Sequence, residues 1–157
     1  DVLSRFSNLR ICLGHFAEAK DFELGMRRWD EPQRVPPRVW ALHGIDRLLA
    51  MNAAGPSRVY ADLGDMSEFL WSALLARGRR ERAMRFFRYL GAYCQRFDPG
   101  CRHILFGTDW IMLARAPRHE RYLETIRRGL SDAGWPQSWQ ANLLHDNLQR
   151  FLEPRAS

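Results

Sequence analysis

Short apolar runs alternate with longer segments of helical periodicity along the whole chain. Three runs have the composition of buried parallel strands, at residues 9–13, 58–63 and 103–106. Helices are expected where apolar residues recur at spacings of three and four: 39–49, 69–74, 83–97, 122–130 and 139–152. The alternation of strands and helices predicts an α/β fold with a parallel sheet and right-handed crossovers.

Three strands do not complete a sheet of this kind. They would leave both edges without a partner and one face poorly covered by helices. The chain also begins at Asp1, with Val2, Leu3 and Phe6 already in helical spacing, which favours a piece of a longer polypeptide. We therefore predict a single domain over residues 1–157. It would be the C-terminal portion, about three βα units, of a (β/α)8 TIM-like barrel with additional helices.

A polar side chain follows each predicted strand. His15 follows the first strand, Asp62 and Asp65 lie at the end of the second, and Asp109 follows the third. In a (β/α) barrel the carboxyl ends of the strands converge on one face, where the active site lies, so His15 and Asp109 are expected to meet there. The alternatives are local: a histidine bonded to a loop carbonyl, and aspartates that cap the segments following the strands.

Four segments resemble the amidohydrolase-related enzymes, a family of metal-dependent hydrolases and decarboxylases. Residues 8–16 (NLRICLGHF) are similar to the sixth-strand segment, whose histidine points into the site. Residues 104–110 (ILFGTDW) resemble the eighth-strand segment, which ends in Gly-Ser/Thr-Asp and an aromatic residue. Residues 59–63 look like the strand between them, and 147–152 look like the closing helix, where an asparagine precedes a Phe-Leu pair. The segments occur in the family's order and cover nearly the whole chain.

The resemblance implies hydrolysis of amides or lactones, or decarboxylation, of a small-molecule substrate with a divalent metal, commonly zinc. Asp109 would be the carboxylate that contacts the metal and moves a proton to or from water. His15 would be a second residue at the metal, polarising the substrate or orienting the nucleophile. Trp110 would form a wall of the substrate pocket.

The chain departs from the family pattern in two ways. It contains no His-x-His, so the family's first-strand ligands and those of the fourth and fifth strands would lie upstream of Asp1. Phe16, Ala17 and Glu18 follow His15, where the family has glycines. Two protein ligands fall short of the three that a catalytic zinc requires.

These departures limit what the fragment can do. We expect it to be inactive alone, with the metal held only in the complete protein. Its first partner would be the missing N-terminal barrel strands, from the same polypeptide or another chain. The alternative is a non-catalytic interaction module built on a degenerate barrel. His103, His119 and His145 have no partners at the spacing of metal ligands.

The formal net charge of +6 raises the question of a nucleic-acid partner. The arginines are scattered along every helix, near acids such as Glu81, Glu120 and Glu124, rather than gathered on one stripe with aromatic side chains. This distribution argues against nucleic-acid binding. The sequence also shows no apolar run near the roughly 20 residues that span a bilayer, and no basic n-region followed by an apolar h-region and a cleavage site. We expect no membrane association, and a homo-oligomer stays open.

The cysteines indicate the redox compartment. Cys12, Cys94 and Cys101 are odd in number and form no C-x-x-C pair, which suggests neither a disulfide framework nor a structural zinc site. Cys12 falls within an apolar strand, where a buried small hydrophobic residue is expected. The pattern fits a reducing compartment, and we expect a cytoplasmic protein.

Overall fold

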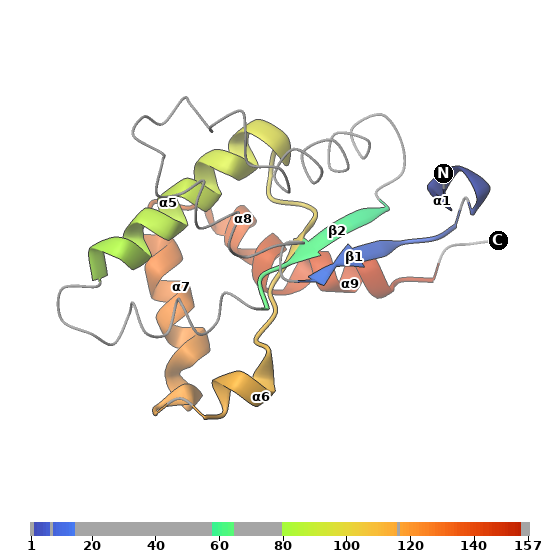
Figure 1. Ribbon diagram of the computed structural model, residues 1–157. Coiled ribbons are helices and arrows are strands. Elements are labelled where there is room, and N and C mark those ends of the chain that lie inside the picture. The colour runs from blue at the N-terminus through green and yellow to red at the C-terminus, as the bar shows by residue number, and fades with distance from the viewer. Residues whose placement is uncertain (1, 7, 15–57, 65–79, 116, 155–157) are drawn as a thin grey trace.

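The computed structural model describes residues 2–6, 8–14, 58–64, 80–115 and 117–154 (Figure 1). The helices predicted at 39–49 and 69–74 lie outside these residues. So do His15, Asp65 and the segment that follows His15. The description below concerns the remaining parts of the chain, which include all three predicted strands.

The three strands form one parallel sheet. β1 (Ile11–Leu13), β2 (Val59–Asp62) and β3 (Ile104–Leu105) lie in the order β1-β2-β3, so their order in space is their order in the sequence. Cys12 lies opposite Tyr60, and Asp62 lies opposite Leu105. The prediction of three parallel strands is confirmed, although each hydrogen-bonded stretch is shorter than the apolar run that marks it.

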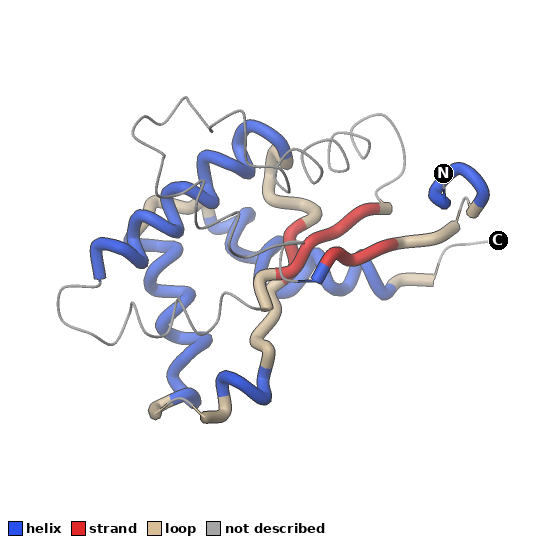
Figure 2. Tube along the Cα trace, in the orientation of Figure 1, coloured by secondary structure: helices blue, strands red, loops and turns tan. Residues whose placement is uncertain are grey.

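Helices lie before, between and after these strands along the chain. In the described residues they are α1 (Val2–Arg5), α5 (Arg80–Phe97), α6 (Trp110–Leu113), the 3-10 turn η2 (His119–Arg121), α7 (Tyr122–Asp132), α8 (Gln137–Ala141), the π-helical segment η3 (Asn142–Asp146) and α9 (Asn147–Leu152). Figure 2 shows α9 running along the strands, with α5 and α7 packed to one side. None of these described helices is both long and apolar enough to cross a lipid bilayer.

The apolar stripe of α5 forms the centre of the core. Its side chains Phe86, Phe87, Leu90 and Tyr93 are almost completely buried. They pack against Ile126 and Leu130 of α7, and the Trp135 indole Nε1 donates a hydrogen bond to the Phe87 carbonyl at 2.9 Å. The helical spacing that predicted α5 therefore also identified the face that it buries.

The C-terminal helix differs from the prediction of one regular helix over 139–152. Its middle turn, η3, is π-helical: the amide of Asn147 bonds to the carbonyl of Asn142, five residues back. The residue spacing of a π turn differs only slightly from that of an α turn, so the apolar periodicity does not reveal it. Single π turns of this kind often mark places where a helix meets a structural or functional demand.

Candidate active site at the carboxyl end of the sheet

Asp62 lies at the carboxyl end of the central strand, between the ends of its two neighbours. Its Oδ1 accepts a hydrogen bond from the backbone amide of Gly64 at 2.8 Å. Its Oδ2 accepts a weaker one from the Cys12 thiol, with Sγ 3.7 Å away. The carboxylate thus connects the end of β2 to β1, the strand that leads to His15.

Two glycines bring the third strand's loop to the same place. A Cβ on Gly107 would lie 3.0 Å from the backbone nitrogen of Gly64 and 3.1 Å from its Cα. A Cβ on Gly64 would lie 3.0 Å from Asp62 Oδ1 and 4.0 Å from the backbone nitrogen of Asp109. Real Cβ atoms are seldom this close to backbone atoms, so glycine at these positions allows the segment after β3 to approach the turn after β2. The loop carrying Asp109 therefore reaches the Asp62 carboxylate.

Asp109 has the properties of an available carboxylate. It is half-buried, and its backbone has φ +40°, a left-handed conformation that Asp and Asn tolerate better than most residues. Its carbonyl accepts the Leu113 amide at 3.1 Å, which begins α6. No hydrogen bond to its carboxylate is found within the described residues. No bond from its side chain to the first amides of α6 is found within the described residues, so the capping alternative does not account for the carboxylate.

The other predicted site residues have different outcomes. His15 lies outside the described residues, so its meeting with Asp109 stays a prediction. Trp110 begins α6, but its side chain is not described, and its place in a pocket is also still a prediction. For Asp62 the sequence favours a local capping role, and its bond to the Gly64 amide is of that kind. The structure also places its carboxylate at the centre of the strand ends, beside Cys12. Its position as the last residue of the middle strand is the sequence signal that could have identified it.

The described residues do not by themselves form a metal centre. Among them, no three His, Cys, Asp or Glu side chains lie close enough together to hold a metal ion. Asp109 could supply one carboxylate ligand, but a catalytic zinc normally has three protein ligands. Further ligands would have to come from residues outside those described or from outside this chain.

Burial and the nearby Asp62 carboxylate raise the pKa of the Cys12 thiol to about 12. The Asp62→Asn variant removes the negative charge that opposes thiolate formation, so the pKa of Cys12 should fall. Each unit of that fall gives about tenfold more thiolate at pH 8. We expect iodoacetamide to alkylate Cys12 correspondingly faster, as measured by peptide mass spectrometry, with buried Cys94 and Cys101 as internal controls. An unchanged rate would show that Asp62 does not act on Cys12.

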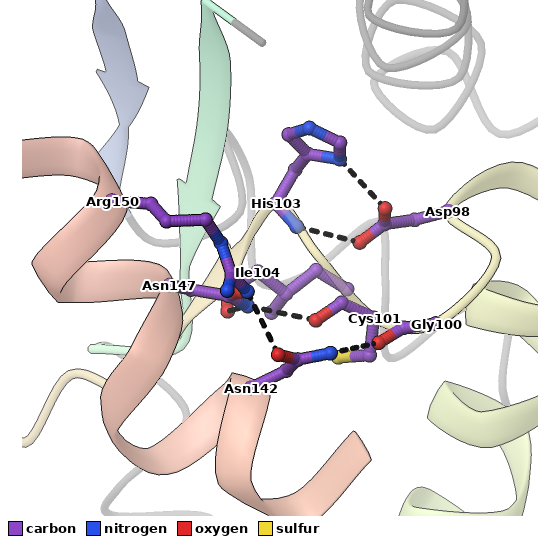
Figure 3. Close-up of polar contacts among 8 residues, drawn as sticks. All are labelled: Asp98, Gly100, Cys101, His103, Ile104, Asn142, Asn147 and Arg150. Carbon is purple, nitrogen blue, oxygen red and sulfur yellow. Dashed lines mark hydrogen bonds and ion pairs between the residues drawn. The ribbon is translucent and has the colours of Figure 1, made fainter. Parts of the chain in front are cut away.

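His103 has a partner that its sequence context did not indicate. It precedes β3, at the amino end of the sheet, and its Nδ1 lies 2.7 Å from Asp98 Oδ1 (Figure 3). The His103 backbone amide also donates to Asp98 Oδ2 at 2.9 Å, and both residues are buried. The pair closes the turn between α5 and β3, at the opposite end of the sheet from Asp109. It is therefore a structural contact rather than part of the candidate site.

Two crystal structures of an amidohydrolase from Burkholderia multivorans are similar to this chain over 98% and 96% of its length. The structure with bound zinc has a TM-score of 0.54 at 17% sequence identity, and the one with bound HEPES has 0.53 at 18%. This chain has the fold of an amidohydrolase. The resemblance that the four sequence segments suggested is thus confirmed at the level of the fold.

The amidohydrolase match covers 47% of the Burkholderia protein in both structures, so this chain spans about half of its length. That coverage agrees with the expected C-terminal fragment. No protein-family model and no curated protein matches the sequence. At an identity below one fifth, the structural similarity shows the amidohydrolase fold and the α/β class. The reaction has to be argued from the site.

Proposed function

We propose that this chain is the C-terminal half of a metal-dependent hydrolase of the amidohydrolase type, acting on an amide or lactone or decarboxylating a small acid. The observation that carries the proposal is the Asp109 carboxylate. It follows β3, the last of the described strands, at the end of the sheet where Asp62 also lies, and no hydrogen bond to it is found in the described residues. Such a carboxylate can accept a proton or bind a cation.

Each residue of the site then has a distinct role. Asp109 would hold a divalent cation and take a proton from the attacking water. Asp62 would hold β1, through Cys12, to the turn after β2 at Gly64, against which the Gly107 segment after β3 packs. His15 would orient the substrate or the nucleophile, and Trp110 would form part of the pocket wall. A bound divalent cation supplies the remaining chemistry by lowering the pKa of water towards about 7.

The proposed partner of this chain is the other half of the barrel. The Burkholderia amidohydrolase with bound zinc is about twice as long, which supports a metal site completed by residues from that other half. The complementing strands would belong to the same polypeptide or to another chain. The substrate would be a small molecule bound over the carboxyl ends of the strands.

Metal removal tests the proposal on the complete protein. Dialysis against a chelator should abolish hydrolysis of lactone or amide substrates, because the water then keeps its ordinary pKa. Addition of zinc should restore activity, and elemental analysis should find metal in proportion to the restored activity. Full activity in a protein shown to be free of metal would contradict the proposal.

A non-catalytic interaction module is the second candidate. The feature that favours it is the departure from the family pattern: the chain contains no His-x-His, and Phe16, Ala17 and Glu18 follow His15 where the family has glycines. It predicts a complete protein that binds no stoichiometric zinc and hydrolyses none of these substrates, while remaining folded. Metal content and circular dichroism of one preparation therefore separate the two functions.

A further inference from the structure

The segment between Asp109 and α7 leaves the carboxyl end of β3 and returns to it. The chain passes from Asp109 through α6 and then enters α7 (Figure 1). Tyr122, the first residue of α7, is buried, and its ring stacks on the Phe106 ring with the two centroids 5.9 Å apart. Phe106 directly follows β3, so both ends of this segment are anchored at the strand end that carries the candidate site.

Three exposed arginines lie on this segment and are called the rim arginines below. They are Arg115, Arg118 and Arg121, and the exposed His119 lies among them. Arg115 and Arg118 make no hydrogen bond or ion pair within the described residues. Arg121 Nε lies 3.8 Å from Glu124 Oε2, and both side chains are more than half exposed. An exposed ion pair of this length is weak, so all three guanidinium groups are available to a ligand.

Arginines at the amino end of the sheet are used differently. Arg58 precedes β2 and donates a hydrogen bond to the Leu3 carbonyl at 2.6 Å. Arg10 precedes β1 and donates to the Phe151 carbonyl at 2.6 Å. Each of these guanidinium groups holds two backbone segments together. The rim arginines make no such bond to the backbone in the described part of the chain, so internal bonding does not explain why they gather at the carboxyl end.

The backbone and the charges of this segment are both unfavourable. Arg118 has φ +62°, a left-handed conformation that is uncommon for any residue except glycine. Arg118, His119 and Arg121 lie just before α7, where the helix dipole opposes positive charge. Glu120 and Glu124 offset part of that charge. Strained backbone is concentrated at ligand-binding and active sites, and a bound anion would offset the remaining positive charge.

We propose that the rim arginines bind a carboxylate group of the substrate. The inference rests on the proposed function and narrows it to substrates that carry a carboxylate in addition to the bond that is cleaved. Guanidinium groups suit this ligand, because their N–H donors match the two oxygens of a carboxylate. Asp109 and the rim arginines belong to one segment, which would hold the anionic end of the substrate away from the Asp109 carboxylate.

Pairs of substrates test the inference on the complete protein loaded with zinc. Each pair is a lactone or amide that carries a carboxylate, and the same compound with a neutral carboxamide in its place. Arg115→Gln combined with Arg118→Gln should raise KM for the carboxylate member by about tenfold with little change in kcat, because two exposed charge contacts outside the reacting bond are lost. KM for the neutral member should not change.

Arg127→Gln combined with Arg128→Gln is the matched control. It removes the same charge from exposed positions further along α7, so KM should not change for either member. In the unaltered protein, added salt should raise KM for the carboxylate member only, because salt screens exposed charges. This salt dependence decides the question even if the variant at Arg115 and Arg118 fails to fold.

Isothermal titration calorimetry separates this inference from the proposed function, because it measures binding without turnover. If the carboxylate members bind more tightly and the preference depends on the rim arginines, while no member is hydrolysed, the proposed function is wrong and the carboxylate site stands. If no pair shows a preference for its carboxylate member, the inference is overturned. It is also overturned if the variant at Arg115 and Arg118 folds and behaves like the control.

Discussion

Asp109→Asn is expected to lower the turnover of the complete protein on its amide or lactone substrate by about 10²- to 10⁴-fold, the range typical of a removed general acid or base. An amide cannot accept the proton that the carboxylate would take, and it is a poorer ligand for a divalent cation. Asparagine tolerates the positive φ of Asp109 as well as aspartate does, so the loop should keep its conformation.

Asp132→Asn is the matched control for this measurement. Asp132 is exposed at the end of α7, so the same chemical change there should leave turnover unchanged. Steady-state kinetics with zinc content measured on each variant would show whether turnover, metal binding or both depend on Asp109. If Asp109→Asn kept full turnover, Asp109 would have no place in the mechanism, and the proposed function would lose the observation that supports it.

Gly129→Val is expected to reduce the free energy of unfolding by about 3 kcal/mol, the upper range for overpacking a core. Gly129 is buried in α7, and a Cβ there would lie 2.9 Å from Cζ and 3.0 Å from Cδ2 of Phe87. The Phe87 ring cannot easily move away, because it is buried and packs edge-on against the Phe86 ring, with the two ring centroids 5.5 Å apart. Valine adds two further methyl groups to the same contact.

Arg128→Val places the same side chain at the adjacent exposed position of α7, outside the core, and so shows the cost of a valine in this helix without overpacking. Denaturant unfolding should show only a small change for this control. Phe87→Leu combined with Gly129→Val should be less destabilising than the sum of the two single changes, because the smaller side chain leaves room for valine. Strict additivity would mean that the two positions do not compete for space.

The helix and strand patterns were predictable where they depend on neighbouring residues. The stripe Phe86, Phe87, Leu90 and Tyr93 marked both α5 and its buried face, and the three apolar runs marked all three strands. The predicted ends of these elements were less accurate. The apolar run predicted a strand over 103–106, whereas the hydrogen-bonded strand β3 spans only Ile104–Leu105. The π turn at η3 was not predicted, because its apolar spacing is nearly that of an α helix.

The candidate site was predictable only in part. Asp109 was predicted as a site residue because it follows a strand in a recognisable Gly-Thr-Asp-Trp segment, and its role in the site stays a prediction. No capping bond to its carboxylate is found in the described residues. For Asp62 only a local capping role was predictable, since its bond to the Gly64 amide is local and its contact with Cys12 is not. The buried pair of His103 and Asp98 was missed because a turn, rather than ligand spacing, brings the two together.

The amino-acid sequence by itself determined the α/β class, the three strands, the apolar face of α5 and the amidohydrolase resemblance, because each follows from periodicity or motifs within a short window. Only the tertiary structure decided that Asp62 contacts Cys12, 50 residues away, and that Asn147 donates a hydrogen bond to the Ile104 carbonyl, 43 residues before it. Such contacts depend on which side chains and backbone groups the folded sheet and helices bring within hydrogen-bond distance, and a pattern within a short window of sequence does not contain that information.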